Sequence, residues 1–172
     1  MRIVLTGPIG AGKTTLCMKT LNIFESLNLK PCGFITYFED RMREKLIIKD
    51  IATGKKDVLA VKSEKGGERV GKYLFLTEGI DFGVRAIERK KDVCFVDELG
   101  RLELNGMGFY RVFQQIRKFE DLVITSRCDF VDDVEKKLGV NLERYRIGGD
   151  MREDVFNILR KEIYREKGYP IM

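Results

Sequence analysis

RIVLTGPIGAGKTT, residues 2–15, carries the strongest fold signal in the chain. Residues 2–6 are a run of β-branched and aliphatic residues, which predicts a buried strand. Residues 7–14 match the pattern GxxxxGK(S/T), and residues 14–27 place apolar side chains at helical spacing. This order of strand, glycine loop and helix is the context in which the pattern binds phosphate, and it predicts an α/β fold.

The loop has the residue types that a polyphosphate site requires. Its glycines let the backbone N–H groups point inward, and the positive end of the following helix attracts anions. We expect Lys13 to reach the β- and γ-phosphates and to act in catalysis, and Thr14 to offer its hydroxyl to Mg²⁺. The expected nucleotide-binding residues are Gly7, Pro8, Ile9, Gly10, Ala11, Gly12, Lys13, Thr14 and Thr15. The alternative is an ordinary glycine turn, although the pattern arises by chance with a probability on the order of one percent at ordinary glycine usage.

A second apolar run, VCFVDE at residues 93–98, ends in two carboxylates. We expect Asp97 to help hold Mg²⁺ from the carboxyl end of a core strand, where ligands of parallel sheets bind. Glu98 is the expected catalytic base, because a carboxylate at this place can polarise the water that attacks the γ-phosphorus. The alternative is a pair of solvated acids at a strand end.

The remaining signals predict one domain, residues 1–172, with a mainly parallel sheet and helices on both faces. Residues 39–78 lack a helix pattern and predict an antiparallel insert built on a β-hairpin with a glycine turn. Asp150 and Glu153 resemble a capping box that opens a C-terminal helix. The predicted strands are 33–38, 45–51, 57–61, 70–76, 93–96, 122–125 and 144–147, and the predicted helices are 79–89, 108–119, 131–138 and the segment from 150 onward.

The charge balance and the histidine and cysteine content of the chain limit the functions it can have. The chain has 172 residues and a net charge of +5, but its 32 basic residues are interleaved with 27 acidic ones, which favours solvated helix faces over a nucleic-acid surface. It has no histidine, which excludes a histidine-based catalytic dyad, and its four cysteines form no CxxC pair. No apolar run is long enough to span a membrane. The Met1-Arg2 start running directly into a strand leads us to expect a cytoplasmic protein without a signal peptide.

Two further segments carry a family resemblance. Gly33-Phe34-Ile35-Thr36 is similar to a Gly-Phe-x-Thr segment, and VDELGRLEL at residues 96–104 resembles an extended signature of the small nucleoside-triphosphatases called THEP1. Together with the loop, the resemblance covers nearly the whole chain. It implies a monomeric or loosely associated Mg²⁺-dependent hydrolase that accepts ATP, GTP and also CTP and UTP, and turns over slowly. It also implies that Glu98 is the base and that Glu103 supports the site. The family often has an acidic residue directly after this threonine. Here Tyr37 and Phe38 lie between Thr36 and Glu39.

Weaker candidates follow the next predicted strand. Thr125 ends LVIT, beside the strand of Asp97, where a polar group can sense the γ-phosphate. Arg127 follows and could stabilise charge on the transferring phosphoryl group, and Arg101 is a lesser candidate for the same role. The alternative for each arginine is a surface residue, and for Arg101 this alternative is favoured. Tyr73, Phe109 and Tyr110 are candidates for stacking on the base, or core residues.

Three functions remain open on the sequence. The first is an NTP hydrolase, favoured by the Asp97-Glu98 pair. The second is a nucleotide or small-molecule kinase, although no clustered lid arginines are evident. The third is a nucleotide-dependent switch or nucleic-acid-stimulated ATPase, suggested by the basic surplus.

Overall fold

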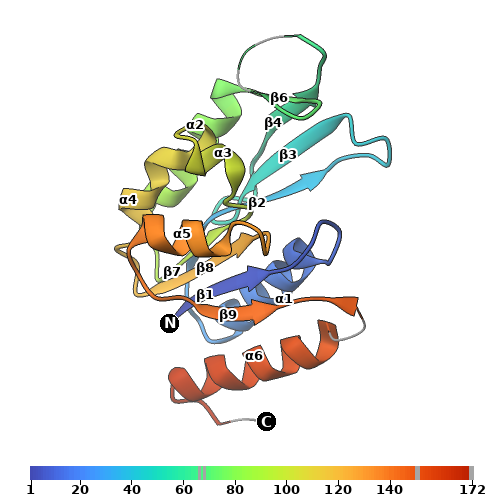
Figure 1. The fold of residues 1–172 in the computed structure, drawn as a ribbon. Helices are drawn as coiled ribbons and strands as arrows, with labels where there is room; N and C mark the ends of the chain where they lie inside the picture. Colours follow the sequence, from blue (N-terminus) through green and yellow to red (C-terminus); the bar gives the residue numbers. More distant parts are fainter. Residues whose placement is uncertain (66, 68, 150–151, 171–172) are drawn as a thin grey trace.

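The computed structural model describes residues 1–65, 67, 69–149 and 152–170. These residues contain one nine-stranded sheet in the order β5-β6-β4-β3-β2-β7-β8-β1-β9 (Figure 1). Five neighbouring strands run parallel, as predicted for the core. They are β2 (Pro31–Phe38), β7 (Val93–Val96), β8 (Asp121–Ser126), β1 (Arg2–Thr6) and β9 (Glu143–Arg146).

The antiparallel insert continues the same sheet beyond β2. Its strands pair antiparallel with one another and, through β3, with β2. They are β3 (Lys45–Asp50), β4 (Lys56–Lys62), β5 (Arg69–Val70) and β6 (Tyr73–Phe75). The predicted fold class, a mainly parallel α/β sheet with an antiparallel hairpin insert, is therefore confirmed.

Helices cover both faces of the sheet (Figure 1). One face carries α1 (Lys13–Ser26) and α6 (Arg152–Glu166). The other carries α2 (Thr77–Glu88), α3 (Arg101–Leu104), the 3-10 helix η1 (Gly108–Val112), α4 (Phe113–Ile116) and α5 (Val131–Leu138). No helix among the described residues is long and apolar enough to cross a membrane.

The alternation of side chains along the strands separates two hydrophobic cores. Val93 and Phe95 of β7 join the core under α1 and α6, whereas Cys94 and Val96 join the core on the other face. The ring of Phe24 from α1 meets that of Phe95 edge to face, with centroids 5.8 Å apart. Because β7 is buried on both faces, its sequence is wholly apolar, and the first charged residue, Asp97, follows directly after it.

Several predicted boundaries were wrong for local reasons. β2 begins at Pro31, two residues before the predicted start, because Gly33 lies inside the strand at φ 93°. A Cβ on Gly33 would stand 1.9 Å from the carbonyl oxygen of Phe95 in the neighbouring strand, so only glycine fits. The strand predicted at 70–76 is two short strands separated by a turn, and the helix predicted at 108–119 is broken at Phe109, whose φ and ψ are −84° and 18°. The predicted capping pair involves Asp150, which lies outside the described residues.

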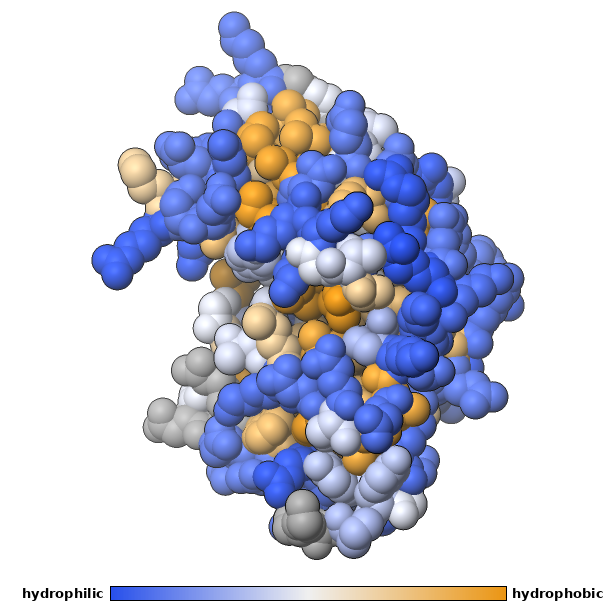
Figure 2. All heavy atoms as spheres, turned by 180° about the vertical axis from the view of Figure 1, so that it is seen from behind, coloured by the Kyte–Doolittle hydropathy of each residue, from blue (hydrophilic) through white to orange (hydrophobic). Residues whose placement is uncertain are grey.

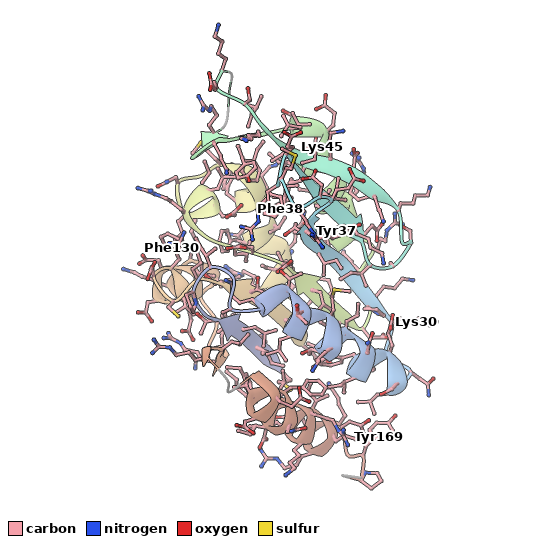
Figure 3. All side chains as sticks on the ribbon, turned by 90° about the vertical axis from the view of Figure 1, so that its right-hand side faces the viewer. Lys30, Tyr37, Phe38, Lys45, Phe130 and Tyr169 are labelled. Carbon is pink, nitrogen blue, oxygen red and sulfur yellow. The ribbon has the colours of Figure 1, made fainter. Side chains whose placement is uncertain are left out.

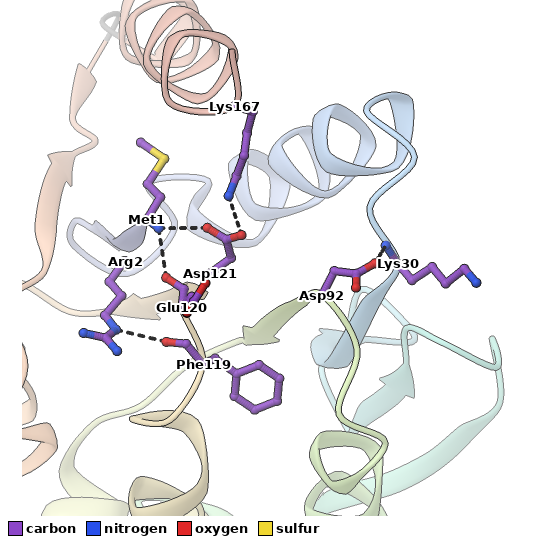
Figure 4. A network of polar contacts seen from close by, with 8 residues as sticks. All are labelled: Met1, Arg2, Lys30, Asp92, Phe119, Glu120, Asp121 and Lys167. Atoms are coloured by element: carbon purple, nitrogen blue, oxygen red, sulfur yellow. Dashed lines mark hydrogen bonds and ion pairs between the residues drawn. The ribbon is translucent and has the colours of Figure 1, made fainter. Parts of the chain in front are cut away.

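A polar network fixes the amino ends of the parallel strands (Figure 4). The Met1 ammonium group donates to Asp121 Oδ1 at 2.8 Å, and Lys167 Nζ lies 2.5 Å from Asp121 Oδ2. Arg2 Nε donates to the carbonyl oxygen of Phe119 at 3.0 Å. These contacts connect the starts of β1 and β8 with the segment after α6, at the edge of the sheet opposite the carboxyl strand ends.

Candidate active site

The glycine loop joins β1 directly to α1. Gly12 precedes the helix in the left-handed conformation at φ 93°, which costs a residue with a Cβ roughly 1–2 kcal/mol. Lys13 folds back over the loop, and its Nζ donates to the carbonyl oxygens of Gly7 and Pro8, each at 3.2 Å. Its side chain is only 7% exposed. The loop therefore holds one ammonium group at its centre, above the first N–H groups of α1, which is the charge pattern that a polyphosphate requires.

Asp97 joins three separate elements at the carboxyl ends of the strands. Its Oδ2 accepts from Thr14 Oγ1 at 2.9 Å, and also from the backbone N–H of Thr36 at 3.0 Å and Thr36 Oγ1 at 3.3 Å. Its Oδ1 accepts from Thr125 Oγ1 at 2.7 Å. Burial raises the pKa of Asp97, while the donors of Thr36, Thr125 and Thr14 lower it. The structure thus brings the predicted metal residues Thr14 and Asp97 into direct contact.

The oxygen donors at this contact fit a magnesium ion. Mg²⁺ prefers hard oxygen ligands, and it is usually held by one or two protein groups with water and substrate phosphates. The hydroxyl of Thr14 and the carboxylate of Asp97 supply such oxygens beside the phosphate loop. In the described ranges no cluster of three or more His, Cys, Asp or Glu side chains could form a complete protein cage.

Glu98 follows the end of β7 in a strained conformation. Its φ is 70°, unusual for a residue with a side chain, and such conformations cost on the order of 1–3 kcal/mol. Its backbone N–H donates to Thr125 Oγ1 at 2.9 Å, which holds this conformation in place. The Glu98 side chain is exposed to solvent, but protein surrounds it at longer range. This partial desolvation raises the pKa of the carboxyl group, whereas the positive charges of Lys13 and Arg127 lower it. This backbone conformation therefore places the Glu98 carboxylate near Lys13 of the glycine loop.

Thr125 occupies the position expected of a sensing residue. β8 lies between β1 and β7, so Thr125 stands between the loop and Asp97. Its hydroxyl accepts from Glu98 N–H and donates to Asp97. One side chain consequently orients both acids, which the sequence alone did not indicate.

Arg127 is near the site but paired with a neighbour. Its Nη2 lies 3.0 Å from Asp129 Oδ2, and its guanidinium carbon is 4.9 Å from the centroid of the Phe130 ring. An ion pair this exposed contributes about 0–1 kcal/mol. The guanidinium can therefore be released at low cost, and the role predicted for Arg127 stays a prediction.

Glu103 is a buried support below the site. It is 4% exposed, and its carboxylate accepts from the N–H of Gly100 at 2.9 Å and of Phe109 at 3.3 Å. It therefore ties the start of α3 to η1. Phe109, a predicted stacking candidate, is core: it is 2% exposed and its ring packs on Phe34 with centroids 4.4 Å apart.

The burial of Glu103 predicts a pH-dependent stability. Desolvation raises its pKa in the folded protein from 4.5 to about 7. As the pH rises through this interval the unfolded chain loses the proton first, so the free energy of unfolding falls, by on the order of 3 kcal/mol.

Glu103→Gln should remove this decrease of the free energy of unfolding with pH. Its amide also loses one backbone hydrogen bond, but it does so at every pH. Urea unfolding between pH 4.5 and 7 checks this, with exposed Glu78→Gln as control. Equal slopes for Glu103→Gln and the unaltered protein would contradict it.

Sequence reasoning missed the functional position of Thr36. It was noted only as part of a resemblance, yet its N–H and hydroxyl both reach Asp97. The sequence does show Thr36 as a polar residue near the end of an apolar strand. It does not show that β2 lies directly beside β7, which brings Thr36 to Asp97.

Comparisons with known proteins identify the family of the chain. A family model described as NTPase matches residues 2–159. The nucleoside-triphosphatase THEP1 of Archaeoglobus fulgidus is 33% identical over 148 residues, which cover 81% of this chain and 87% of that protein. That of Methanocaldococcus jannaschii is 33% identical over 172 residues, covering 95% and 97%. The crystal structure of THEP1 from the hyperthermophile Aquifex aeolicus is similar with a TM-score of 0.67 and 26% identity, covering 92% of this chain and 99% of that one. The chain that carries this loop and this acidic pair therefore belongs to the THEP1 family of nucleoside-triphosphatases.

Proposed function

We propose that the protein hydrolyses Mg²⁺–NTP to NDP and phosphate with little preference for the base. The observation that supports this is the 2.9 Å hydrogen bond from Thr14 to Asp97, which joins the phosphate loop to the acidic strand end. Glu98 follows Asp97 directly, so a base and a phosphate cradle share one edge of the sheet.

Each residue has a distinct task in this mechanism. The loop N–H groups and Lys13 hold the polyphosphate and balance the charge that develops on it. Glu98 accepts a proton from the attacking water, whose oxygen bonds to the γ-phosphorus as the bond to the β–γ bridging oxygen breaks. Asp97 and Thr125 fix the position of Glu98 and the hydroxyl of Thr14. Bound Mg²⁺ would add neutralisation of the β- and γ-phosphate oxygens.

Broad base use is expected because the loop addresses only the phosphates. Phosphate release from ATP, GTP, CTP and UTP, without any acceptor, should give kcat/KM values within about tenfold of one another. Chelation of Mg²⁺ should abolish release. A preference of about a hundredfold for one base would contradict broad use, and no release from any NTP would contradict the hydrolase.

Thr14 offers a specific test of the metal site. Thr14→Ala should raise the Mg²⁺ concentration needed for half-maximal turnover by about 10- to 100-fold, since the hydroxyl ligand is lost. Thr14→Ser is the matched control, because it retains the hydroxyl and should need little more Mg²⁺ than the unaltered protein. If both variants showed the same Mg²⁺ dependence, Thr14 would not be a ligand.

The proposal extends to a monomer that acts in the cytoplasm. Its basis is the THEP1 resemblance and a surface rich in charge, with Lys, Arg, Asp and Glu forming 34% of the chain. Sedimentation analysis of the full chain tests the monomer, and a concentration-independent dimer would contradict it.

A further inference from the structure

A cavity of about 210 Å³ opens beside the two acids. Its polar floor is formed by Thr36, Asp97 and Glu98, and Arg101, Glu103 and Arg127 stand around it. The remaining wall is apolar. Half of its side chains come from the antiparallel insert, namely Leu46, Leu59, Val70 and Phe75, and the others are Phe38, Leu102, Phe109 and Phe130. Figure 3 shows Phe38 and Phe130 near the beginning of α1, and in Figure 2 apolar side chains reach the surface of the upper part, which holds the insert.

The cavity lies beyond the terminal phosphate of a bound nucleotide. None of its lining residues belongs to the loop, whereas two of them are Asp97 and Glu98. Lys13 and Thr14 place the γ-phosphate toward Asp97. A separate hollow at the first turn of α1 is lined by Gly12, Thr15, Leu16, Lys19 and Glu153, and the nucleoside end of a nucleotide held by the loop would extend past it. The cavity therefore faces the side from which the attacking group must approach.

Its volume exceeds what hydrolysis requires. A water molecule occupies about 30 Å³ in the liquid, so the space could hold several times the volume of one nucleophilic water. Its wall is mostly carbon, a surface that gives water few hydrogen-bond partners. Such a wall is suited to an organic molecule with an apolar ring.

Two arginines at the cavity, Arg101 and Arg127, are available to bind a negative group on that molecule, beside the carboxylates of Asp97, Glu98 and Glu103. In the described part of the chain no side chain pairs with the Arg101 guanidinium. Among the described residues, Arg127 contacts Asp129 in an exposed ion pair and lies over the ring of Phe130. Guanidinium groups bind carboxylate or phosphate in paired hydrogen bonds. Glu98, in contrast, is suited to receive a proton from a hydroxyl.

We infer that this cavity binds a phosphoryl acceptor, a small ring-bearing alcohol that carries a carboxylate or phosphate. The inference deepens the proposed function, on which it rests, because the same loop and base serve both reactions. The alcohol oxygen bonds to the γ-phosphorus, and the bond from that phosphorus to the β–γ bridging oxygen breaks. The bridging oxygen leaves with the electron pair on NDP, and the hydroxyl proton passes to Glu98.

The test uses two matched alcohols with the full chain and Mg²⁺–ATP. Benzyl alcohol is the neutral probe, and para-hydroxymethylbenzoate adds a carboxylate on the same ring. Phosphorus NMR should detect a phosphate ester beside inorganic phosphate, with more ester from the benzoate because of the arginines. Saturation-transfer NMR should show ring protons of the benzoate in contact with the protein.

A substitution that fills the cavity tests whether the alcohol binds there. Leu46, a half-buried residue of β3, lines the cavity, whereas the half-buried Leu74 of β6 does not. Leu46→Trp should lower ester formation by about tenfold or more while phosphate release without alcohol persists; Leu74→Trp should retain both reactions. Thermal unfolding of both variants confirms that each is folded.

The outcomes separate the inference from the hydrolase. Phosphate release with no ester and no ring contact from either alcohol overturns the acceptor and leaves the hydrolase intact. Ester formation that survives Leu46→Trp overturns the cavity as its site. A rise in the KM for ATP in Leu46→Trp alone overturns it as well, because the cavity would then hold the nucleoside. Ester formation without any hydrolysis supports the acceptor and contradicts the hydrolase.

Discussion

Lys13→Ala is expected to lower kcat/KM for NTP hydrolysis by about 10³- to 10⁵-fold. Losing a charge-assisted contact to phosphate costs about 1.5–3 kcal/mol of binding, and losing a group that stabilises the transition state costs about 10²- to 10³-fold in kcat. The side chain is buried in the loop and bonded to the carbonyl oxygens of Gly7 and Pro8, so no other cation can replace it there. Calorimetry with Mg²⁺–ATP and steady-state phosphate release measure the two parts separately.

The matched control is Lys161→Ala on the exposed surface of α6. It removes the same charge from an exposed position that lines neither of the hollows beside the loop, and it should retain binding and turnover. If Lys13→Ala bound Mg²⁺–ATP normally, the loop would not be the nucleotide site.

Glu98→Gln should keep nucleotide binding and lower kcat by about 10²- to 10⁴-fold, the range for loss of a general base. Glutamine has the same size and the same backbone, so the bond from residue 98 N–H to Thr125 can persist. The substitution removes proton acceptance together with the negative charge, which interacts with Lys13 and Arg127. Single-turnover kinetics at saturating Mg²⁺–ATP, with the affinity measured by calorimetry, separate chemistry from binding.

Glu25→Gln, in an exposed position on α1, is the control for loss of a carboxylate. It should turn over like the unaltered protein. Normal turnover by Glu98→Gln would exclude Glu98 as the base, whatever the geometry.

The loop and the acidic pair were predictable because each is a local pattern. A glycine loop between an apolar strand and a helix specifies its own conformation, and the residues after a buried strand fall at its carboxyl end. Their convergence rests on the parallel order of the sheet, which the alternation of strands and helices predicted in outline. The 2.9 Å contact of Thr14 with Asp97 depends on that order.

The rest depended on which strands become neighbours. Thr125 was expected beside the strand of Asp97, but its contacts with both acids depend on β8 lying between β1 and β7. The contact of Thr36 with Asp97 depends on β2 lying beside β7. Gly33 was mistaken for a strand boundary, although close approach to Phe95 requires it inside the strand. Helix spacing over 108–119 was mistaken for one helix because spacing alone does not show the break at Phe109.

The shared strand β2 has a mechanical consequence. One edge of β2 pairs with β7, which leads into Asp97, and its other edge pairs with β3 of the insert. Because an unbroken hydrogen-bond ladder connects the two halves, the insert cannot swing on a hinge as a mobile lid does. The shape of the proposed acceptor cavity is then fixed by the sheet, and replacing its lining side chains on β3 and β4, Leu46 and Leu59, would change that shape without altering the phosphate loop.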